Sequence, residues 1–184
     1  MRSFIFAAAL AVFVIPSAQA QEPQPHAAQE SDVSYQLPQL PADHEPLLAS
    51  EDPRLAANKR LVYNMYRIVL QAGLADRAGE YIAEDYIQHN PNAGQGLAGV
   101  QAYIRATRPE RAIEDRLELP LIHLMAEGDY VTTAFVRPEK DGEGRTYYST
   151  WFDLYRIENG KIAEHWDPML KSDRTIDPNE SRLD

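Results

Sequence analysis

The first half of the chain carries apolar residues at helical spacing. Asp52 and Pro53 form a typical helix start, an N-cap followed by proline in the first turn. Apolar residues then recur every three or four positions until Gly73 ends the run; they include Leu55, Val62, Met65, Val69 and Ala72. We therefore expect a long amphipathic helix over residues 53–72, a short helix over 75–84 and a third over 97–107.

Beyond Pro109 the pattern changes to short runs rich in β-branched and aromatic residues. Turn signals separate them, the clearest being Glu158-Asn159-Gly160. The runs cover residues 117–125, 130–137, 146–157 and 161–167. Three helices followed by an antiparallel meander predict an α+β domain, in which a curved sheet packs on the helices and a hollow can remain between the layers.

The ends of the chain differ from this domain. Residues 1–20 read as a secretory signal peptide, with Arg2, a short apolar core and an Ala-Gln-Ala cleavage site, although an uncleaved anchor is an alternative. Residues 21–52 read as an extended, proline-rich tether in which His26 and His44 are solvated, although Val33, Tyr35, Leu37 and Leu40 could let part of it lie along the domain as an edge segment. Residues 53–172 read as the domain, and 173–184 as a polar tail. We expect a periplasmic or secreted protein that is free of the membrane after cleavage.

The composition and motifs of the chain exclude several classes of partner and site. The net charge is -10, so the surface repels phosphate backbones and we expect no nucleic-acid partner. The chain has no cysteine, which excludes disulfides and a thiol nucleophile. The glycines at 94, 96 and 99 fit neither phosphate-binding fingerprint. His89, His123 and His165 lie too far apart in sequence for a typical zinc motif, so we expect no metal.

The last two predicted strands carry the candidate chemistry. Strand alternation places Trp151, Asp153 and Tyr155 on one face, and His165 and Asp167 on one face of the next strand. A carboxylate walled by aromatic rings is desolvated and suits general acid or base work, although Asp153 could equally face water or pair with an arginine.

Four motifs then follow in order: residues 85–91 (DYIQHNP), Gly96-x-x-Gly99, residues 127–131 (EGDYV) and residues 153–167 (DLYRIENGKIAEHWD). Over residues 54–170 this series resembles the SnoaL-like polyketide cyclase family of the nuclear transport factor 2-like superfamily. The resemblance implies a cone-shaped α+β barrel that encloses an apolar pocket, commonly in a homodimer and without cofactor. A departure at residues 132–135 (TTAF), where relatives often carry a histidine, leaves the substrate open.

The resemblance also implies a set of site residues. Asp167 matches an aspartate that moves protons in an intramolecular aldol ring closure, His89 matches a histidine that lines the pocket, and Asp153 completes the catalytic group. Substrate contacts are expected from His165, Trp151, Tyr155, Tyr63 and Tyr66, although helical spacing gives the last two an ordinary packing role as an alternative.

Two functions follow. In the first, the protein is a cofactor-independent acid–base enzyme: Asp167 removes a proton beside a carbonyl, while His89 or a tyrosine stabilises the enolate. In the second, the same pocket only binds a small apolar ligand, because the fold alone does not decide between catalysis and binding. A third reading, an accessory domain that forms oligomers, would leave the cavity filled by its own side chains.

Overall fold

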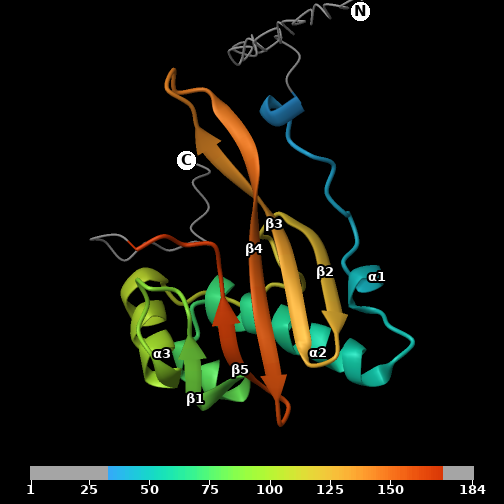
Figure 1. Ribbon diagram of the computed structural model, residues 1–184, viewed down its shortest axis with the longest axis vertical. Helices are drawn as coiled ribbons and strands as arrows, with labels where there is room; N and C mark the ends of the chain where they lie inside the picture. The colour runs from blue at the N-terminus through green and yellow to red at the C-terminus, as the bar shows by residue number, and fades with distance from the viewer. Residues whose placement is uncertain (1–32, 172–184) are drawn as a thin grey trace, which may run out of the picture. The chain divides into compact units, whose positions relative to one another are not determined.

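The computed structural model describes residues 33–171, in which helices lie against one face of a twisted sheet (Figure 1). The signal peptide and tail expected at residues 1–20 and 173–184 lie outside the described residues. The helical elements are η1 (Val33–Tyr35), α1 (Glu45–Leu48), α2 (Pro53–Asn64), η2 (Met65–Gln71), η3 (Ala75–Glu80) and α3 (Gly96–Thr107). The strands are β1 (Ile82–Gln88), β2 (Leu121–Glu127), β3 (Tyr130–Lys140), β4 (Thr146–Glu158) and β5 (Lys161–Trp166).

The long first helix is confirmed and begins where its capping signal predicts. The Asp52 side chain accepts a hydrogen bond of 2.8 Å from the Arg54 amide. α2 then continues without a break into η2, which has π-helical hydrogen bonding. Gly73 follows the helix with a positive φ of 70°, and a Cβ there would lie 2.6 Å from the Pro109 carbonyl oxygen. Glycine is therefore needed at this helix end.

The sheet has the strand order β1-β5-β4-β3-β2. Strands β2 to β5 form the predicted antiparallel meander, and Asn159 and Gly160, both with positive φ, form the tight turn between β4 and β5. The core lies between the inner face of the sheet and the helices. It is formed by Val62, Tyr66, Val69, Ile104, Leu121, Leu124, Val131 and Ile162 among others.

One prediction about this sheet is wrong. The helix expected over residues 75–84 ends at Glu80, and β1 begins at Ile82. β1 pairs in parallel with β5, so the sheet is mixed rather than purely antiparallel. Burial explains the difference, because Ile82 and Tyr86 are 4% and 5% exposed on the core side of this strand. The fold is nevertheless of the expected α+β class, with a five-stranded sheet packed on helices.

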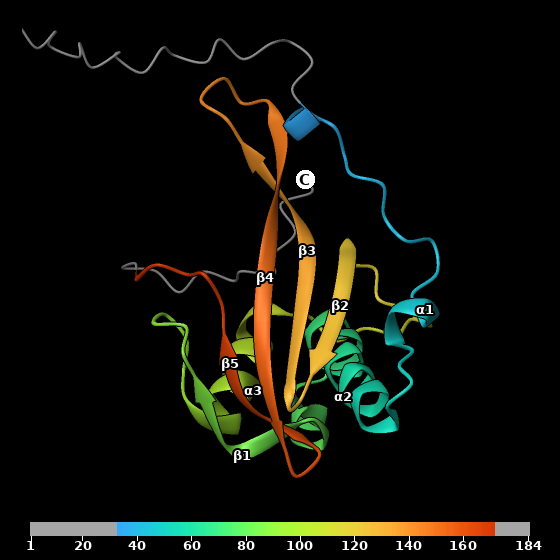
Figure 2. The same cartoon turned by 45° about the vertical axis from the view of Figure 1, so that its right-hand side comes forward.

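Residues 33–48 run beside the β2 edge of the sheet, and we call them the N-terminal strap (Figure 2). Leu48 is 2% exposed, and the Tyr35 hydroxyl donates to Asp141 at 2.9 Å. The expectation that His44 is solvated is wrong, because this ring is buried and its Nδ1 lies 2.9 Å from the Tyr63 hydroxyl. His26 lies outside the described residues. None of the helices in residues 33–171 is long and apolar enough to span a bilayer.

Candidate active site

Asp153 is the most buried polar group of the site. Alternation along β4 turns it to the inner face of the sheet together with Trp151 and Tyr155, as predicted, and its side chain has no exposed surface. It neither faces water nor pairs with an arginine. Its Oδ1 accepts hydrogen bonds from Trp151 Nε1 at 2.9 Å and from His165 Nε2 at 3.0 Å, and its Oδ2 accepts a short one from the Tyr66 hydroxyl. The carboxylate is therefore held by three neighbours.

A chain of hydroxyl groups continues from Asp153 into the core. Tyr155 donates to the Tyr66 hydroxyl at 2.7 Å, and Thr133 Oγ1 lies 3.2 Å from the same oxygen. Burial, with the Asp153 charge next, raises the pKa of both tyrosines well above the usual value. Tyr66 and Tyr155 therefore keep their hydrogens and act as hydrogen-bond donors.

His165 lies beside Asp153 on β5, stacked on the Tyr155 ring with 4.7 Å between the ring centroids. Its Nδ1 lies 3.0 Å from Gln88 Oε1. The Gln88 amide cannot be reversed, because Oε1 also accepts the Asn90 backbone N–H at 2.9 Å while Nε2 donates to the Tyr86 hydroxyl at 3.1 Å. The Nδ1 atom must therefore carry a hydrogen and donate it to Gln88.

This arrangement fixes the protons of the Asp153–His165 pair. With Nδ1 protonated, the neutral ring would turn the bare Nε2 toward a carboxylate oxygen, and two acceptors cannot face each other at 3.0 Å. A second hydrogen must lie between them. Because the Asp153 carboxylate already accepts from Trp151 and Tyr66, the pair is best described as an imidazolium and a carboxylate. Both ring nitrogens of His165 are then occupied as donors.

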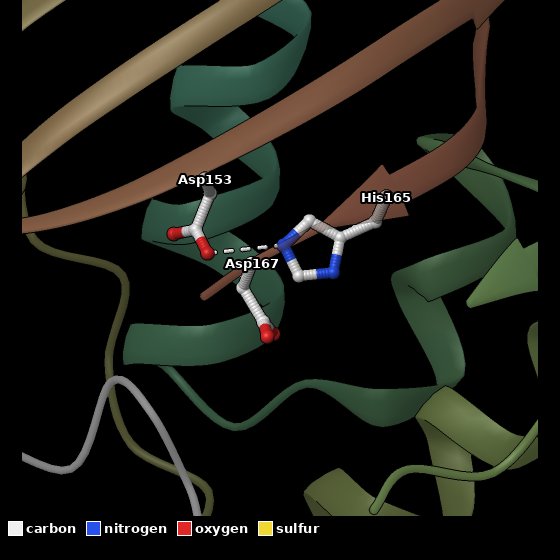
Figure 3. A group of neighbouring side chains, drawn as sticks. All are labelled: Asp153, His165 and Asp167. Atoms are coloured by element: carbon white, nitrogen blue, oxygen red, sulfur yellow. Dashed lines mark hydrogen bonds and ion pairs between the residues drawn. The ribbon is translucent and has the colours of Figure 1, made fainter. Parts of the chain in front are cut away.

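Asp167 follows directly after β5 and is only partly buried. Asn90 Nδ2 donates to its Oδ2 at 2.8 Å, and the Met169 amide donates to Oδ1 at 3.0 Å. Asp153, His165 and Asp167 lie close together, each offering an atom within 4.8 Å of the others (Figure 3). Two carboxylates and an imidazole are groups that bind divalent cations, but His165 would have to lose its Nε2 hydrogen before it could act as a ligand. Asp153 accepts three hydrogen bonds and Asp167 only two, so each Asp167 oxygen keeps a lone pair that the described residues do not use.

The structure does not bring His89 to this cluster. The ring stacks on Trp166, with centroids 4.5 Å apart, and its Nε2 lies 2.9 Å from Glu164 Oε2. Glu164 and Trp166 alternate with His165 along β5, so His89 lies on the outer face of the sheet. The His89 ring and the Arg156 guanidinium lower the pKa of Glu164. The expectation that His89 lines the pocket with Asp167 is therefore wrong.

The aromatic residues expected to bind substrate divide into two groups. Trp151, Tyr66 and Tyr155 join His165 around Asp153, and the Arg137 guanidinium covers the Trp151 ring 4.5 Å from its centroid. Tyr63 lies elsewhere, because its hydroxyl accepts the Leu117 amide and contacts His44 of the strap.

Three residues of the site were not predicted: Tyr86, Gln88 and Asn90. They belong to the first of the four motifs, whose only residue named for chemistry was His89. The sequence contained a signal for two of them, because Tyr86 and Gln88 are two residues apart and therefore share a face when the segment forms a strand.

Comparison with known proteins agrees with this architecture. Among solved structures, the chain is similar to TsrD from Streptomyces laurentii (26% identity, 61% of this chain and 87% of that chain covered, TM-score 0.44). It is also similar to an LEH-like epoxide hydrolase from M. tuberculosis (16%, 62% and 84%, 0.46) and to a Xanthomonas campestris protein of unknown function with a cystatin-like fold (24%, 60% and 88%, 0.43). A search of curated proteins found no match. The model of the SnoaL-like domain matches residues 62–165. Because this match spans more than half of the chain, the protein belongs to the SnoaL-like domain family, as its four motifs predict.

Proposed function

We propose that the protein is an acid–base enzyme that acts on a small apolar carbonyl compound, with Asp167 as the proton-transferring base. The observation that carries the proposal is the difference between the two carboxylates. Asp153 is fully buried and committed to Trp151, Tyr66 and His165, whereas Asp167 is partly exposed and keeps unused lone pairs. Membership of the SnoaL-like family supports an enzyme that needs no cofactor.

The buried pair has a supporting role in this proposal. The imidazolium of His165 is locked between Asp153 and Gln88, so it has no donor or acceptor left for a substrate. Its positive charge lies close to Asp167 and favours the negative charge that develops when a proton leaves carbon. The free-energy cost of keeping His165 charged arises when the site folds, so it does not add to the barrier of the reaction.

The reaction starts with enolisation. Asp167 takes a proton from the carbon beside the carbonyl, the C–H electron pair forms a carbon–carbon double bond, and the carbonyl π electrons move to oxygen. In an aldol-type closure the enolate carbon then attacks a second carbonyl carbon of the same molecule. A new carbon–carbon bond forms, and the resulting alkoxide takes back the proton from Asp167, so that atoms and charges balance.

Deuterium uptake by a small ketone tests the enolisation step. We expect the protein to catalyse exchange of the α-hydrogens of 1-indanone or 2-tetralone in D2O, followed by NMR. Asp167→Asn should lower the rate by about 10² to 10⁴ while leaving the unfolding free energy nearly unchanged. Asp85→Asn, at an exposed carboxylate of β1, is the matched control. Saturable binding of these ketones without any catalysed exchange would instead identify a ligand-binding module.

We also propose that the protein works outside the cytoplasm, on the basis of the signal peptide predicted at residues 1–20. Mass spectrometry of the protein isolated from its host should find Gln21 at the N-terminus. An intact N-terminus at Met1 would refute this assignment.

A further inference from the structure

The hydroxyl hydrogens of the buried tyrosines near the site can be assigned one by one. The Tyr66 hydrogen is donated to Asp153, and the Tyr155 hydrogen to Tyr66. The Tyr63 oxygen accepts from the Leu117 amide, and Nδ1 of His44 lies 2.9 Å from the same oxygen, within reach of the Tyr63 hydrogen. Burial and the nearby Arg116 lower the pKa of His44, which favours the neutral ring with one nitrogen free to accept. Each of the three hydroxyls therefore has a hydrogen-bond partner inside the protein.

Tyr86 differs from these three tyrosines. It is 5% exposed, and its hydroxyl oxygen accepts a hydrogen bond of 3.1 Å from Gln88 Nε2. Among residues 33–171, no acceptor is present for its own hydrogen. A buried donor without a partner costs free energy, so natural proteins rarely keep one without a use.

The surroundings of Tyr86 show where this hydrogen is available. Gln88 links the hydroxyl to His165, and the negative charges of both site carboxylates act on it. Burial, followed by the charges of Asp153 and Asp167, raises the pKa of Tyr86 far above its usual value. The hydroxyl therefore stays protonated under all working conditions and is a donor next to the proposed base.

We propose that Tyr86 is a catalytic residue that donates its hydrogen bond to the carbonyl oxygen of the substrate. This inference rests on the proposed function, and it narrows the substrate to a compound whose carbonyl oxygen reaches Tyr86 while its α-carbon reaches Asp167. When Asp167 removes the α-proton, the negative charge moves to that oxygen and the Tyr86 hydrogen bond strengthens. The hydrogen remains on Tyr86, so no additional proton is consumed.

The neighbouring donors cannot take this role. His165 donates through both nitrogens to Asp153 and Gln88, and Asn90 Nδ2 donates to Asp167. Gln88 Nε2 donates to Tyr86 itself, which polarises the hydroxyl and makes it a better donor. Tyr86 is thus the terminal donor of a chain that starts at Gln88.

Binding of a phenolate tests Tyr86 without relying on turnover. The probe is 4-nitrophenolate, an oxyanion whose absorbance reports binding, and 4-nitroanisole has the same nitrophenyl ring with a neutral methyl ether in place of the charged oxygen. The reference protein is Asp167→Asn, in which a negative charge near the probe has been removed. Adding Tyr86→Phe should weaken 4-nitrophenolate binding by about 10- to 100-fold and leave 4-nitroanisole binding unchanged. Tyr130→Phe, at an exposed tyrosine, should change neither.

The outcomes separate this inference from the proposed function. Selective loss of phenolate affinity in Tyr86→Phe supports the donor role even if no ketone exchanges its α-hydrogens. Equal phenolate affinity with and without the hydroxyl, or no phenolate binding to Asp167→Asn at millimolar concentration, overturns it. Failure of the exchange assay alone would count against Asp167 as a base, and not against Tyr86 as an oxyanion donor.

Discussion

Gln88 determines what His165 can do, although it makes no contact with Asp153. Its Oε1 accepts the Nδ1 hydrogen of the imidazole, and this bond turns Nε2 toward the carboxylate. A side chain that sets the tautomer and charge of a histidine affects the chemistry of the ring as strongly as the group bonded to the other ring nitrogen, here Asp153.

The first prediction therefore concerns Gln88→Leu. The wild-type protein should show both His165 nitrogens protonated in 15N NMR spectra, with the resonance assigned by its loss in His165→Asn. In Gln88→Leu the Nδ1 hydrogen loses its acceptor, so we expect the neutral ring that carries hydrogen on Nε2 alone. Gln88→Glu keeps an acceptor at this position and should restore the doubly protonated form. An unchanged His165 spectrum in Gln88→Leu would contradict this account.

At the residue scale, the sequence predicted which face a side chain occupies wherever the segment was recognised as a strand. It did not do so where the strand was not recognised. The β4 and β5 runs were recognised as strands, so Asp153, His165 and Asp167 were placed together correctly. Residues 82–88 were not recognised as a strand, so nothing distinguished Gln88 from its neighbour His89. A shift of one residue changes the face of a sheet, and His89 therefore lies outside while Gln88 lies within the site.

The segment between β1 and α3 shows why Gly94, Gly96 and Gly99 matter. Gly96 has a positive φ of 70°, and Gly94 and Gly99 touch so closely that a Cβ on Gly99 would lie 2.6 Å from the Gly94 carbonyl carbon. The same loop begins with Asn90, which holds Asp167. The glycines allow the chain to fold back tightly enough to keep Asn90 in place, so their role is structural support of the site.

Gly99→Ala is accordingly predicted to disturb both stability and function. The added methyl group meets backbone atoms that cannot rotate away, so we expect a loss of about 1 to 3 kcal/mol in unfolding free energy, measured by urea denaturation. Ketone exchange should also slow, because Asp167 loses its fixed position. Gly142→Ala is the matched control, since a Cβ there meets nothing within 4 Å. Equal stability of the two variants would show that the loop adapts freely.

The strap is held to the domain through His44, and this contact should depend on pH. Burial and Arg116 lower the pKa of His44, whereas Asp43 acts in the opposite direction; Tyr63 is its hydrogen-bond partner. The unfolded chain, with a histidine pKa near 6.5, therefore binds more protons than the folded chain below that value. The stability that His44 contributes is fully present above about pH 6.5 and falls as the pH drops through the lower folded value.

The difference between wild type and His44→Gln isolates this effect. Wild type should be the more stable protein in thermal unfolding at pH 8, and its advantage should shrink as the pH is lowered to 5.5. His123→Gln, at an exposed histidine, should differ from wild type equally at both pH values. An advantage over His44→Gln that grows on acidification would reverse the assigned sign.

At the element scale, local signals predicted what depends on neighbours in sequence. Capping at Asp52, the Gly73 stop and the Asn159-Gly160 turn gave the long helix and the last hairpin. β1 has a weaker local signature, because exposed Glu84 and Asp85 interrupt its apolar pattern and its partner β5 lies about eighty positions away. The burial of His44 in the strap was missed for the same reason, since distant parts of the chain cover it.

Among residues 33–171, apolar side chains are exposed on the sheet face that turns away from the helices. Strand pairing aligns Met125, Thr132, Leu154 and Trp166 in one row across four strands, with Phe152 and Tyr130 on either side. Phe152 is 51% exposed, Met125 50% and Tyr130 44%. A contiguous patch of this kind is typical of a surface that binds another protein.

We propose that a second copy of the chain covers this face, in line with the homodimer expected from the family resemblance. Light scattering coupled to size exclusion should then give twice the chain mass at micromolar concentration. Phe152→Asp places an unpaired charge within the patch, so we expect it to dissociate the dimer, while Asp153 on the opposite face keeps its partners. Ile113→Asp substitutes another partly exposed apolar residue, in the loop before β2, and should remain dimeric. A monomeric wild type, or a Phe152→Asp variant that still has the mass of the dimer, would show that this face does not bind a second copy of the chain.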